Sequence, residues 1–166
     1  MTEVPPRPTV LDATVLSNFA YLDQSPRLQT LSRPVVPAAV RDEIEAGAAD
    51  YPFLTTATDS FSDTLPVVTL GDGSGGVPTP LSTALDPGEA EAFAIAESHD
   101  GLLVTDDGAA RDLARERNVQ FTGTIGVLIE LVDEETIDEE TGDEWLKRLV
   151  DETEYRVPSR DLSAYL

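Results

Sequence analysis

Short apolar runs alternate with longer segments of helical spacing along most of the chain. Apolar runs of this length are typical of buried strands, and apolar positions three and four residues apart indicate the helices that cover them. The pattern predicts strands at 9–11, 34–37, 67–70, 102–104 and 119–121, and helices at 14–21, 38–46, 87–98, 108–117, 124–132 and about 143–153. Strands separated by helices of this length need right-handed crossovers, so we expect an α/β fold with a mostly parallel sheet.

Three stretches interrupt this alternation. Residues 50–65 have no clear periodicity, and residues 71–83, GDGSGGVPTPLST, predict an irregular loop because Gly, Pro, Ser and Thr dominate them. The acidic residues 133–143 predict a solvated turn before the last helix. We expect one domain over residues 1–166, with a core at about 9–132 and a C-terminal helical extension at about 133–166.

The composition agrees with a single intracellular domain. The chain has 166 residues, of which 40% are hydrophobic, which is enough to fill one core. The N-terminus has no basic start followed by an apolar run, and no stretch approaches the roughly 20 apolar residues that cross a bilayer. The absence of cysteine excludes disulfides, cysteine-based zinc sites and thiol nucleophiles. We expect a cytoplasmic protein that does not bind a membrane.

The charge is strongly negative along the whole chain. Acids outnumber bases 32 to 11, and the net charge of −21 would ordinarily argue against a polyanionic partner. All basic residues except Lys147 are arginines, and this pattern suits a protein adapted to high salt, where self-repulsion is screened. We therefore predict a halophilic source, with an acidic protein of ordinary cytoplasm as the alternative.

Acidic residues follow two of the predicted strands directly. Asp12 ends the first strand, and Asp106 and Asp107 follow the strand at 102–104. The carboxyl ends of parallel strands meet at one edge of a sheet, where ligands of such sheets bind. Each aspartate has another explanation, since each precedes a predicted helix that it could cap. Two adjacent acids nevertheless exceed what one cap needs.

Two helices contribute further carboxylates. Glu89 shares a helical face with Ala92, Phe93 and Ala96, which predicts that it points toward the sheet, although it also fits a capping box with Asp86. Glu91 lies on another face of that helix and is expected to be a supporting or solvated acid. Glu43 stands at the edge of the apolar stripe of the helix at 38–46, and surface charge is its alternative explanation.

Inward-facing carboxylates at one sheet edge repel one another and lose hydration, so they need a positive partner. No lysine is available, and the arginines do not cluster near all of these acids. Mg²⁺ or Mn²⁺ is the simplest neutraliser, because these ions prefer oxygen ligands and retain several waters. Such an ion activates water for attack on a phosphodiester and brings a polyanionic backbone to an acidic protein.

Five motifs in this order resemble the PIN-domain superfamily, in particular its prokaryotic toxin-like branch of small nucleases. They are VLDATVLSNF, VVPAAVRDEIEAG, LDPGEAEAFAIA, LLVTDDGAARDLA and FTGTIGVLIEL. The resemblance extends from about Val10 to the C-terminus. It implies a five-stranded parallel sheet in the order 3-2-1-4-5, flanked by helices, and an endoribonuclease that depends on Mg²⁺ or Mn²⁺.

The resemblance also assigns roles to individual positions. The family acids fall on Asp12, Glu43, Glu89 and Asp107, and the implied metal ligands are Asp12, Glu89, Asp106 and Asp107. Glu91 is the alternative third acid, Thr105 matches a polar position that helps to hold such sites together, and Thr14 stands where other members have asparagine. Many relatives have basic residues around the groove, whereas here only Arg41 and Arg111 are obvious candidates.

The implied partners are an RNA substrate, a small antitoxin protein and a second copy of the chain in a homodimer. A catalytically silent PIN module that binds RNA or a protein is the alternative function. A phosphotransfer receiver or phosphatase is a third interpretation of the same acids. Receivers need a lysine on a late strand, and Lys147 lies in the last predicted helix.

Overall fold

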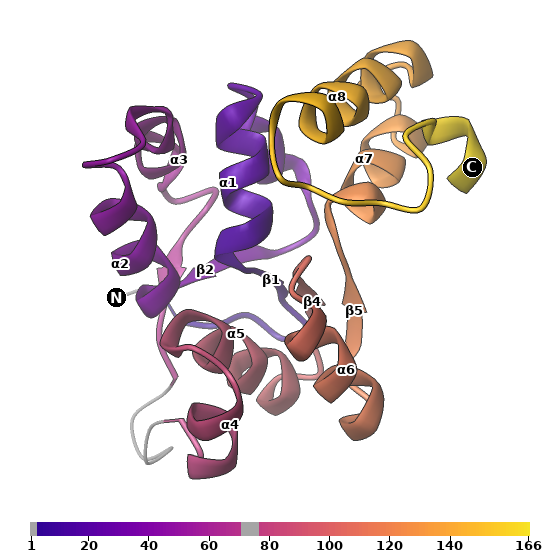
Figure 1. The fold of residues 1–166 in the computed structure, drawn as a ribbon. Helices are drawn as coiled ribbons and strands as arrows, with labels where there is room; N and C mark the ends of the chain where they lie inside the picture. Colours follow the sequence, from indigo (N-terminus) through magenta and orange to yellow (C-terminus); the bar gives the residue numbers. More distant parts are fainter. Residues whose placement is uncertain (1–2, 71–76) are drawn as a thin grey trace.

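Five short parallel strands form the centre of the molecule. The computed structural model describes residues 3–70 and 77–166. The strands are β1 (Thr9–Leu11), β2 (Pro34–Pro37), β3 (Val67–Val68), β4 (Leu102–Val104) and β5 (Gln120–Thr122), and their order in the sheet is β3-β2-β1-β4-β5 (Figure 1). The α/β class and the expected strand order are confirmed.

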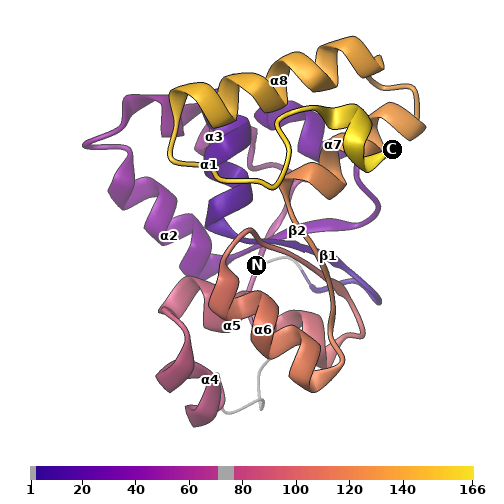
Figure 2. The ribbon, with the colours of Figure 1, turned by 45° about the vertical axis from the view of Figure 1, so that its right-hand side comes forward.

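Helices cover both faces of this sheet (Figure 2). Those of the described residues are α1 (Ala13–Tyr21), α2 (Ala38–Gly47), α3 (Thr55–Ser60), α4 (Thr79–Ala84), α5 (Pro87–Ser98), α6 (Gly108–Arg117), α7 (Thr124–Asp133) and α8 (Glu139–Glu152), with 3-10 turns η1 (Ser25–Thr30), η2 (Pro52–Leu54) and η3 (Leu162–Tyr165). Helices α1, α3, α7 and α8 lie on one side, and α4, α5 and α6 lie on the other. None of the helices described has the length and apolar character needed to cross a bilayer.

Alternate strand residues enter two hydrophobic cores, one on each face. Leu11 and Val104 belong to the core under α1, α7 and α8, whereas Val10 and Leu103 belong to the core under α5 and α6. Because both faces are buried, the strands read as continuous apolar runs instead of alternating patterns. The burial of both faces therefore explains why these strands appear in the sequence as short, wholly apolar runs.

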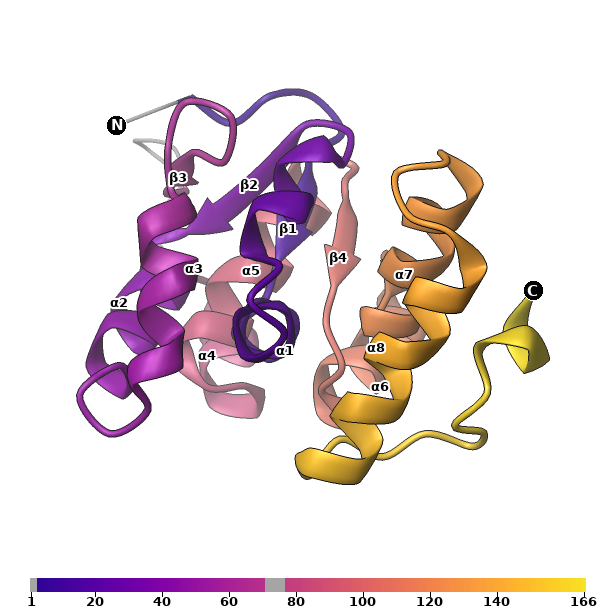
Figure 3. The same cartoon turned by 90° about the horizontal axis from the view of Figure 1, so that it is seen from above.

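The C-terminal part of the chain contributes to the first of these cores. Ile137, Trp145, Leu149 and Leu162 are buried among residues of α1 and α7. Helices α7 and α8 lie side by side, and the segment after α8 turns back along them toward the C-terminus (Figure 3). This arrangement brings the last dozen residues next to α7 and close to the end of β4.

Two expectations about irregular regions were wrong. Helix α8 begins at Glu139, within the stretch expected to be a solvated turn, because Asp138 accepts a hydrogen bond from the backbone of Thr141 and acids favour the first helical turn. Helix α4 occupies the end of the expected loop at 71–83, and Pro80 lies in its first turn, where proline is tolerated. Residues 71–76 of that loop lie outside the described residues.

Strand and helix limits elsewhere agree closely with the sequence pattern. Strand β3 ends two residues earlier than expected, and β5 is shifted by one residue toward the C-terminus. The limits of β4, α5 and α6 are those predicted. These elements deliver most of the candidate acids.

Candidate active site

The carboxyl ends of β1 and β4 lie together at one edge of the sheet. The backbone N–H of Asp12 donates to the carbonyl oxygen of Val104 at 3.0 Å, so the residues that follow the two strands are neighbours. Helices α2 and α5 contact each other beside this edge and add their own carboxylates. We call Asp12, Glu43, Asp86, Glu89 and Asp107 the acid cluster, because the electrostatic interactions described below connect them.

Asp12 is the most deeply buried member of the acid cluster, with 1% of its surface exposed. Its Oδ2 accepts hydrogen bonds from the hydroxyls of Thr105 at 2.7 Å and Thr14 at 3.3 Å. Burial raises the pKa of Asp12, the hydrogen bond from Thr105 opposes the rise, and the charge of Asp86 adds to it. Asp12 stands at the N-cap position of α1 but makes no side-chain capping bond, so capping does not account for it.

Thr105 links the two strand ends. Its hydroxyl donates to Asp12 and accepts from the backbone N–H of Asp107 at 3.1 Å. Thr14 makes a parallel connection, since its hydroxyl accepts from the backbone N–H of Asp106 at 2.9 Å. The carboxylate of Asp107 accepts from the backbone N–H of Ala110 at 2.9 Å and caps α6 with one of its two oxygens. These bonds fix Asp12 and Asp107 relative to each other.

Glu43 reaches the acid cluster across the contact between α2 and α5. A Cβ added at Gly88 would lie 3.0 Å from Glu43 Oε1 and 3.4 Å from Val40 Cγ2, so a glycine at this position lets the two helices approach closely. Glu43 as a whole is exposed, although its Oε1 lies against α5 at this contact. Burial raises the pKa of Glu43, and the charges of Asp86 and Asp12 raise it further.

Glu89 shows the largest electrostatic perturbation of the cluster. Burial, together with a hydrogen bond and charge repulsion from Asp86 and the charges of Asp107 and Asp12, raises the pKa of Glu89 to about 8. Glu89 also completes the expected capping box: Asp86 Oδ1 accepts from its backbone N–H at 2.9 Å, and Glu89 Oε2 accepts from the Asp86 N–H at 3.4 Å. Capping and membership of the acid cluster therefore coexist in one side chain.

Glu91 performs a different task from Glu89. Its Oε1 accepts a hydrogen bond from the backbone N–H of Ala39 at 2.9 Å, at the first turn of α2. Pro37 occupies the N-cap position of α2 and supplies no side-chain bond there. Glu91 thus satisfies the start of α2 from the neighbouring helix, as carboxylates near helix N-termini do, and fixes the position of the helix that carries Glu43.

Asp106 is directed away from the acid cluster. Its Oδ1 accepts from the backbone N–H of Thr124 at 2.8 Å, and its Oδ2 accepts from the hydroxyl of Thr124 at 2.5 Å and from Asn18 Nδ2 at 3.2 Å. A Cβ at Gly123 would collide with Asp106 Oδ1, so this approach requires glycine. The adjacent aspartates therefore secure two different helices, α6 through Asp107 and α7 through Asp106.

Asp86 is a member of the acid cluster that sequence reasoning treated only as a helix cap. Its charge raises the pKa values of Asp12, Glu43 and Glu89. The sequence contained one usable signal. Asp86 is the first residue of the turn that leads to Gly88 and Glu89, and a cap of a helix aimed at the sheet edge must itself lie near that edge.

The acid cluster has no basic partner in the described residues. The ion pairs found in residues 3–70 and 77–166 all involve other acids. Arg41 pairs with Asp42 at 3.0 Å, and Arg111 lies 5.2 Å from the centre of the Phe121 ring. The cluster consequently offers only carboxylate and hydroxyl oxygens, the donor set that suits a hard divalent cation.

The cluster is not arranged as a complete protein cage for an ion. Within the part of the chain that the structure describes, no three His, Asp or Glu side chains stand close enough together to hold a metal by themselves. Mg²⁺ keeps several waters and uses one or two carboxylates in many proteins, so such a cage is not required. Asp12 and Asp107, fixed by Thr105, fit that mode of binding.

Comparison with protein families identifies the family of the chain. The model of the PIN-domain family DUF3368 matches residues 8–166. The chain therefore belongs to this family of PIN domains, which are generally nucleases. No protein among those with curated descriptions matches the chain.

Proposed function

We propose that the protein is an endoribonuclease that depends on Mg²⁺ or Mn²⁺ and cleaves RNA at the acid cluster. The observation that carries the proposal is electrostatic: burial and mutual repulsion raise the pKa values of Asp12, Glu43 and Glu89, and no described cation offsets them. Ionising these carboxylates lowers the stability of the folded protein, and such charges are kept where they bind a ligand. Perturbed pKa values accordingly cluster at functional sites. The PIN-domain membership supports a nuclease.

Within this proposal, Asp12 and Asp107 would hold the cation, and Glu89 would join them as a further ligand only after its side chain moved closer, because the described carboxylates do not form a three-ligand cage. Asp106 would contribute by fixing α7, because its oxygens already accept three hydrogen bonds. Glu43 would orient a water and accept its proton. When bound, the cation would stabilise negative charge on the phosphoryl oxygens and make water a stronger nucleophile.

Thr105 and Thr14 would be positioning residues in this scheme. Their hydroxyls both donate to Asp12 Oδ2, which would leave the second oxygen of that carboxylate for the cation. Glu91 would position α2, and through it Glu43. None of these three needs to contact the substrate.

Cleavage of a labelled single-stranded RNA with and without Mg²⁺ or Mn²⁺ tests the proposal. We expect cleavage that needs the cation and that Asp12→Asn lowers by about a hundredfold or more, since even outer partners of metal sites contribute about 10- to 100-fold. Asp42→Asn, on the surface of the helix that carries Glu43, is the matched control and should keep full activity. RNA binding without cation-dependent cleavage in the native protein would identify a silent module instead.

We further propose that the whole chain, 1–166, is one domain, because the residues of α8 share a core with α1 and α7. We also propose that its surface is adapted to high salt, given the net charge of −21. Thermal unfolding in increasing KCl tests both: one transition whose midpoint rises with salt is expected. Two transitions, or a falling midpoint, would contradict them.

The remaining proposals concern partners and location. Membership of the toxin-like branch would give the protein a small antitoxin, a homodimeric state and a cytoplasmic location. The family match supports the superfamily and leaves this branch to experiment. Co-purification with the product of a neighbouring short reading frame, and light scattering of the purified chain, test the antitoxin and the dimer respectively.

A further inference from the structure

A second feature lies next to Asp106, the residue that precedes Asp107 of the acid cluster. A cavity of about 460 Å³ opens between α6, the start of α7 and the segment that follows α8. Its lining includes Asp106, Arg111, Gly123, Tyr155, Arg156 and Tyr165. Because Asp106 precedes Asp107 at the end of β4, the cavity adjoins the cluster along the same sheet edge.

The two arginines of this cavity lack acidic partners. In the described residues, Arg41, Arg115, Arg117, Arg148, Arg160 and Lys147 all form ion pairs. Arg111 and Arg156 form none, and neither do Arg7, Arg27 and Arg33, but of these five only Arg111 and Arg156 line this cavity. The cavity therefore brings together two guanidinium groups that no acid in the described residues pairs with.

Arg111 gives a more specific indication. Its Nε is buried and has no hydrogen-bond partner within residues 3–70 and 77–166, while its guanidinium lies over the Phe121 ring. An unsatisfied buried donor costs free energy, and native structures contain few of them. A ligand that brings acceptor oxygens into the cavity would remove this cost.

The one acidic residue in the lining, Asp106, forms no ion pair with either arginine in the described residues. Both carboxylate oxygens of Asp106 accept hydrogen bonds from Thr124 of α7 and Asn18 of α1. Tyr155 stays protonated and able to donate, because burial and the nearby charge of Asp106 raise the pKa of its hydroxyl. The cavity therefore combines two cationic forks and a phenol donor.

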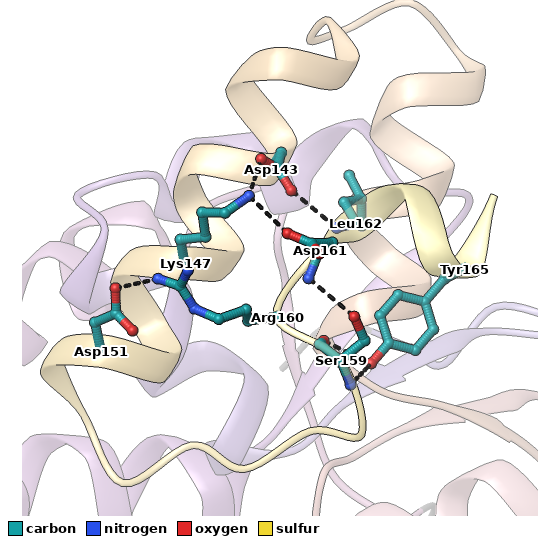
Figure 4. A network of polar contacts seen from close by, with 8 residues as sticks. All are labelled: Asp143, Lys147, Asp151, Ser159, Arg160, Asp161, Leu162 and Tyr165. Atoms are coloured by element: carbon teal, nitrogen blue, oxygen red, sulfur yellow. Dashed lines mark hydrogen bonds and ion pairs between the residues drawn. The ribbon is translucent and has the colours of Figure 1, made fainter.

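The wall that carries Arg156 is held in place by a network on α8 (Figure 4). Lys147 binds both Asp143 and Asp161, Arg160 binds Asp151, and Asp143 Oδ1 accepts from the backbone N–H of Leu162 at 2.9 Å. The Tyr165 hydroxyl donates to the carbonyl of Ser159 at 2.7 Å and closes the turn of the chain. We call the set Asp143, Lys147, Asp151, Arg160 and Asp161 the C-terminal clamp.

We propose that this cavity binds a backbone phosphate of the RNA next to the one that is cleaved, with Arg111 and Arg156 as positioning residues. The inference rests on the proposed function, because it takes the acid cluster as the place of cleavage. Arginine suits the role, since its planar fork matches two phosphate oxygens at once. The cavity would thus supply the basic contact that an acidic nuclease needs to orient its substrate.

Binding of a labelled single-stranded RNA over a series of KCl concentrations tests the proposal, in an Asp12→Asn background that prevents cleavage. Arg111→Gln and Arg156→Gln should each weaken binding about tenfold, as expected for a charge-assisted hydrogen bond. Each should also reduce the slope of log K against log salt by about 0.7, the value for one phosphate contact on a single strand. Arg115→Gln is the control, since Arg115 lies on the same helix and over the same Phe121 ring but pairs with Asp112.

Unchanged affinity and slope in folded Arg156→Gln, an exposed position, would overturn the proposal whatever happens to the partly buried Arg111. Equal competition by poly-glutamate and by RNA would also overturn it, because the cavity would then select carboxylates as readily as phosphates. Failure of the nuclease proposal looks different. Wild-type protein would not cleave RNA under any cation, while both variants would still lose affinity and slope.

Discussion

The acid cluster and the C-terminal clamp use the same kind of side chain with opposite electrostatic results. In the clamp, the hydrogen bond from Lys147 lowers the pKa of Asp143, so its charge stabilises the fold. In the acid cluster, burial raises the pKa values of Asp12 and Glu89, so their charges oppose folding. The difference is that the chain supplies a cation in the clamp, whereas in the acid cluster a bound metal ion would supply it under the proposed function.

Replacing Thr105 tests the acid cluster most severely. Thr105→Val keeps the shape of the side chain but removes the strongest hydrogen bond to buried Asp12 and the acceptor of the Asp107 N–H. We expect cleavage to fall about 10- to 100-fold, as for the outer partners of metal sites. Unfolding free energy should fall by about 1 to 3 kcal/mol, because buried polar groups lose their partners.

RNA cleavage assays and urea denaturation measure these two effects. Thr55→Val, at an exposed position of α3, is the control and should change neither. Full activity in Thr105→Val would mean that Asp12 does not depend on its hydrogen bond for its role.

The pH dependence of stability tests the opposite signs directly. The pKa of Glu89 is raised from 4.5 to about 8 in the folded protein, so its protonated form favours folding. This contribution is complete below pH 4.5 and is lost as the pH rises toward 8. Asp12 and Glu43 shift in the same direction and add to the loss.

Denaturation at several pH values without divalent cations measures this loss. Glu89→Gln should flatten the decline between pH 4.5 and 8, and saturating Mg²⁺ should flatten it in the wild type. Glu45→Gln, an exposed acid of α2, should leave it unchanged. A wild-type protein whose stability rose over this interval would contradict the electrostatic description of the cluster.

The smallest effect is expected from the clamp. Lys147→Met removes the cation shared by Asp143 and Asp161, both of which lie near the surface. Ion pairs at a surface contribute little, so stability should fall less than in Thr105→Val. Cleavage at saturating RNA should persist, whereas the KM should rise if the clamp holds the wall that carries Arg156.

Thermal unfolding and steady-state kinetics of Lys147→Met provide these numbers. Arg148→Met, which breaks the more exposed pair with Glu152 on the same helix, is the matched control. An equal rise of KM in both variants would remove the special role of the clamp.

The parts of the fold that follow local rules could be predicted from the sequence. Helix α5 has the predicted limits because Asp86 and Pro87 give an unambiguous start, and β4 was recognised as a short apolar run between turns. The start of α8 was missed because an acidic run suggests solvent, whereas Asp138 uses the same acidity to cap a helix. The strand order came from the resemblance to PIN domains, since strand spacing alone does not order a sheet.

The candidate site likewise contains positions that the sequence predicts and positions that it does not. Sequence position put Asp12 and Asp107 at one edge, but it could not separate Asp106 from Asp107, because their partners Thr124 and Ala110 lie on different helices. Arg156 was not foreseen at all. Its place depends on a chain reversal after α8 that no local pattern encodes.

The hydrogen bond from Ala39 to Glu91 joins the two acid-bearing helices α2 and α5 into one mechanical unit. Replacing Glu91 by alanine would lower activity as replacing a member of the acid cluster would. The loss would arise indirectly, because α2 would no longer be held in position by Glu91. Glu91→Gln keeps a carbonyl acceptor for the Ala39 N–H and would restore the position of α2. Activity in Glu91→Gln but not in Glu91→Ala would therefore show that Glu91 has a structural role.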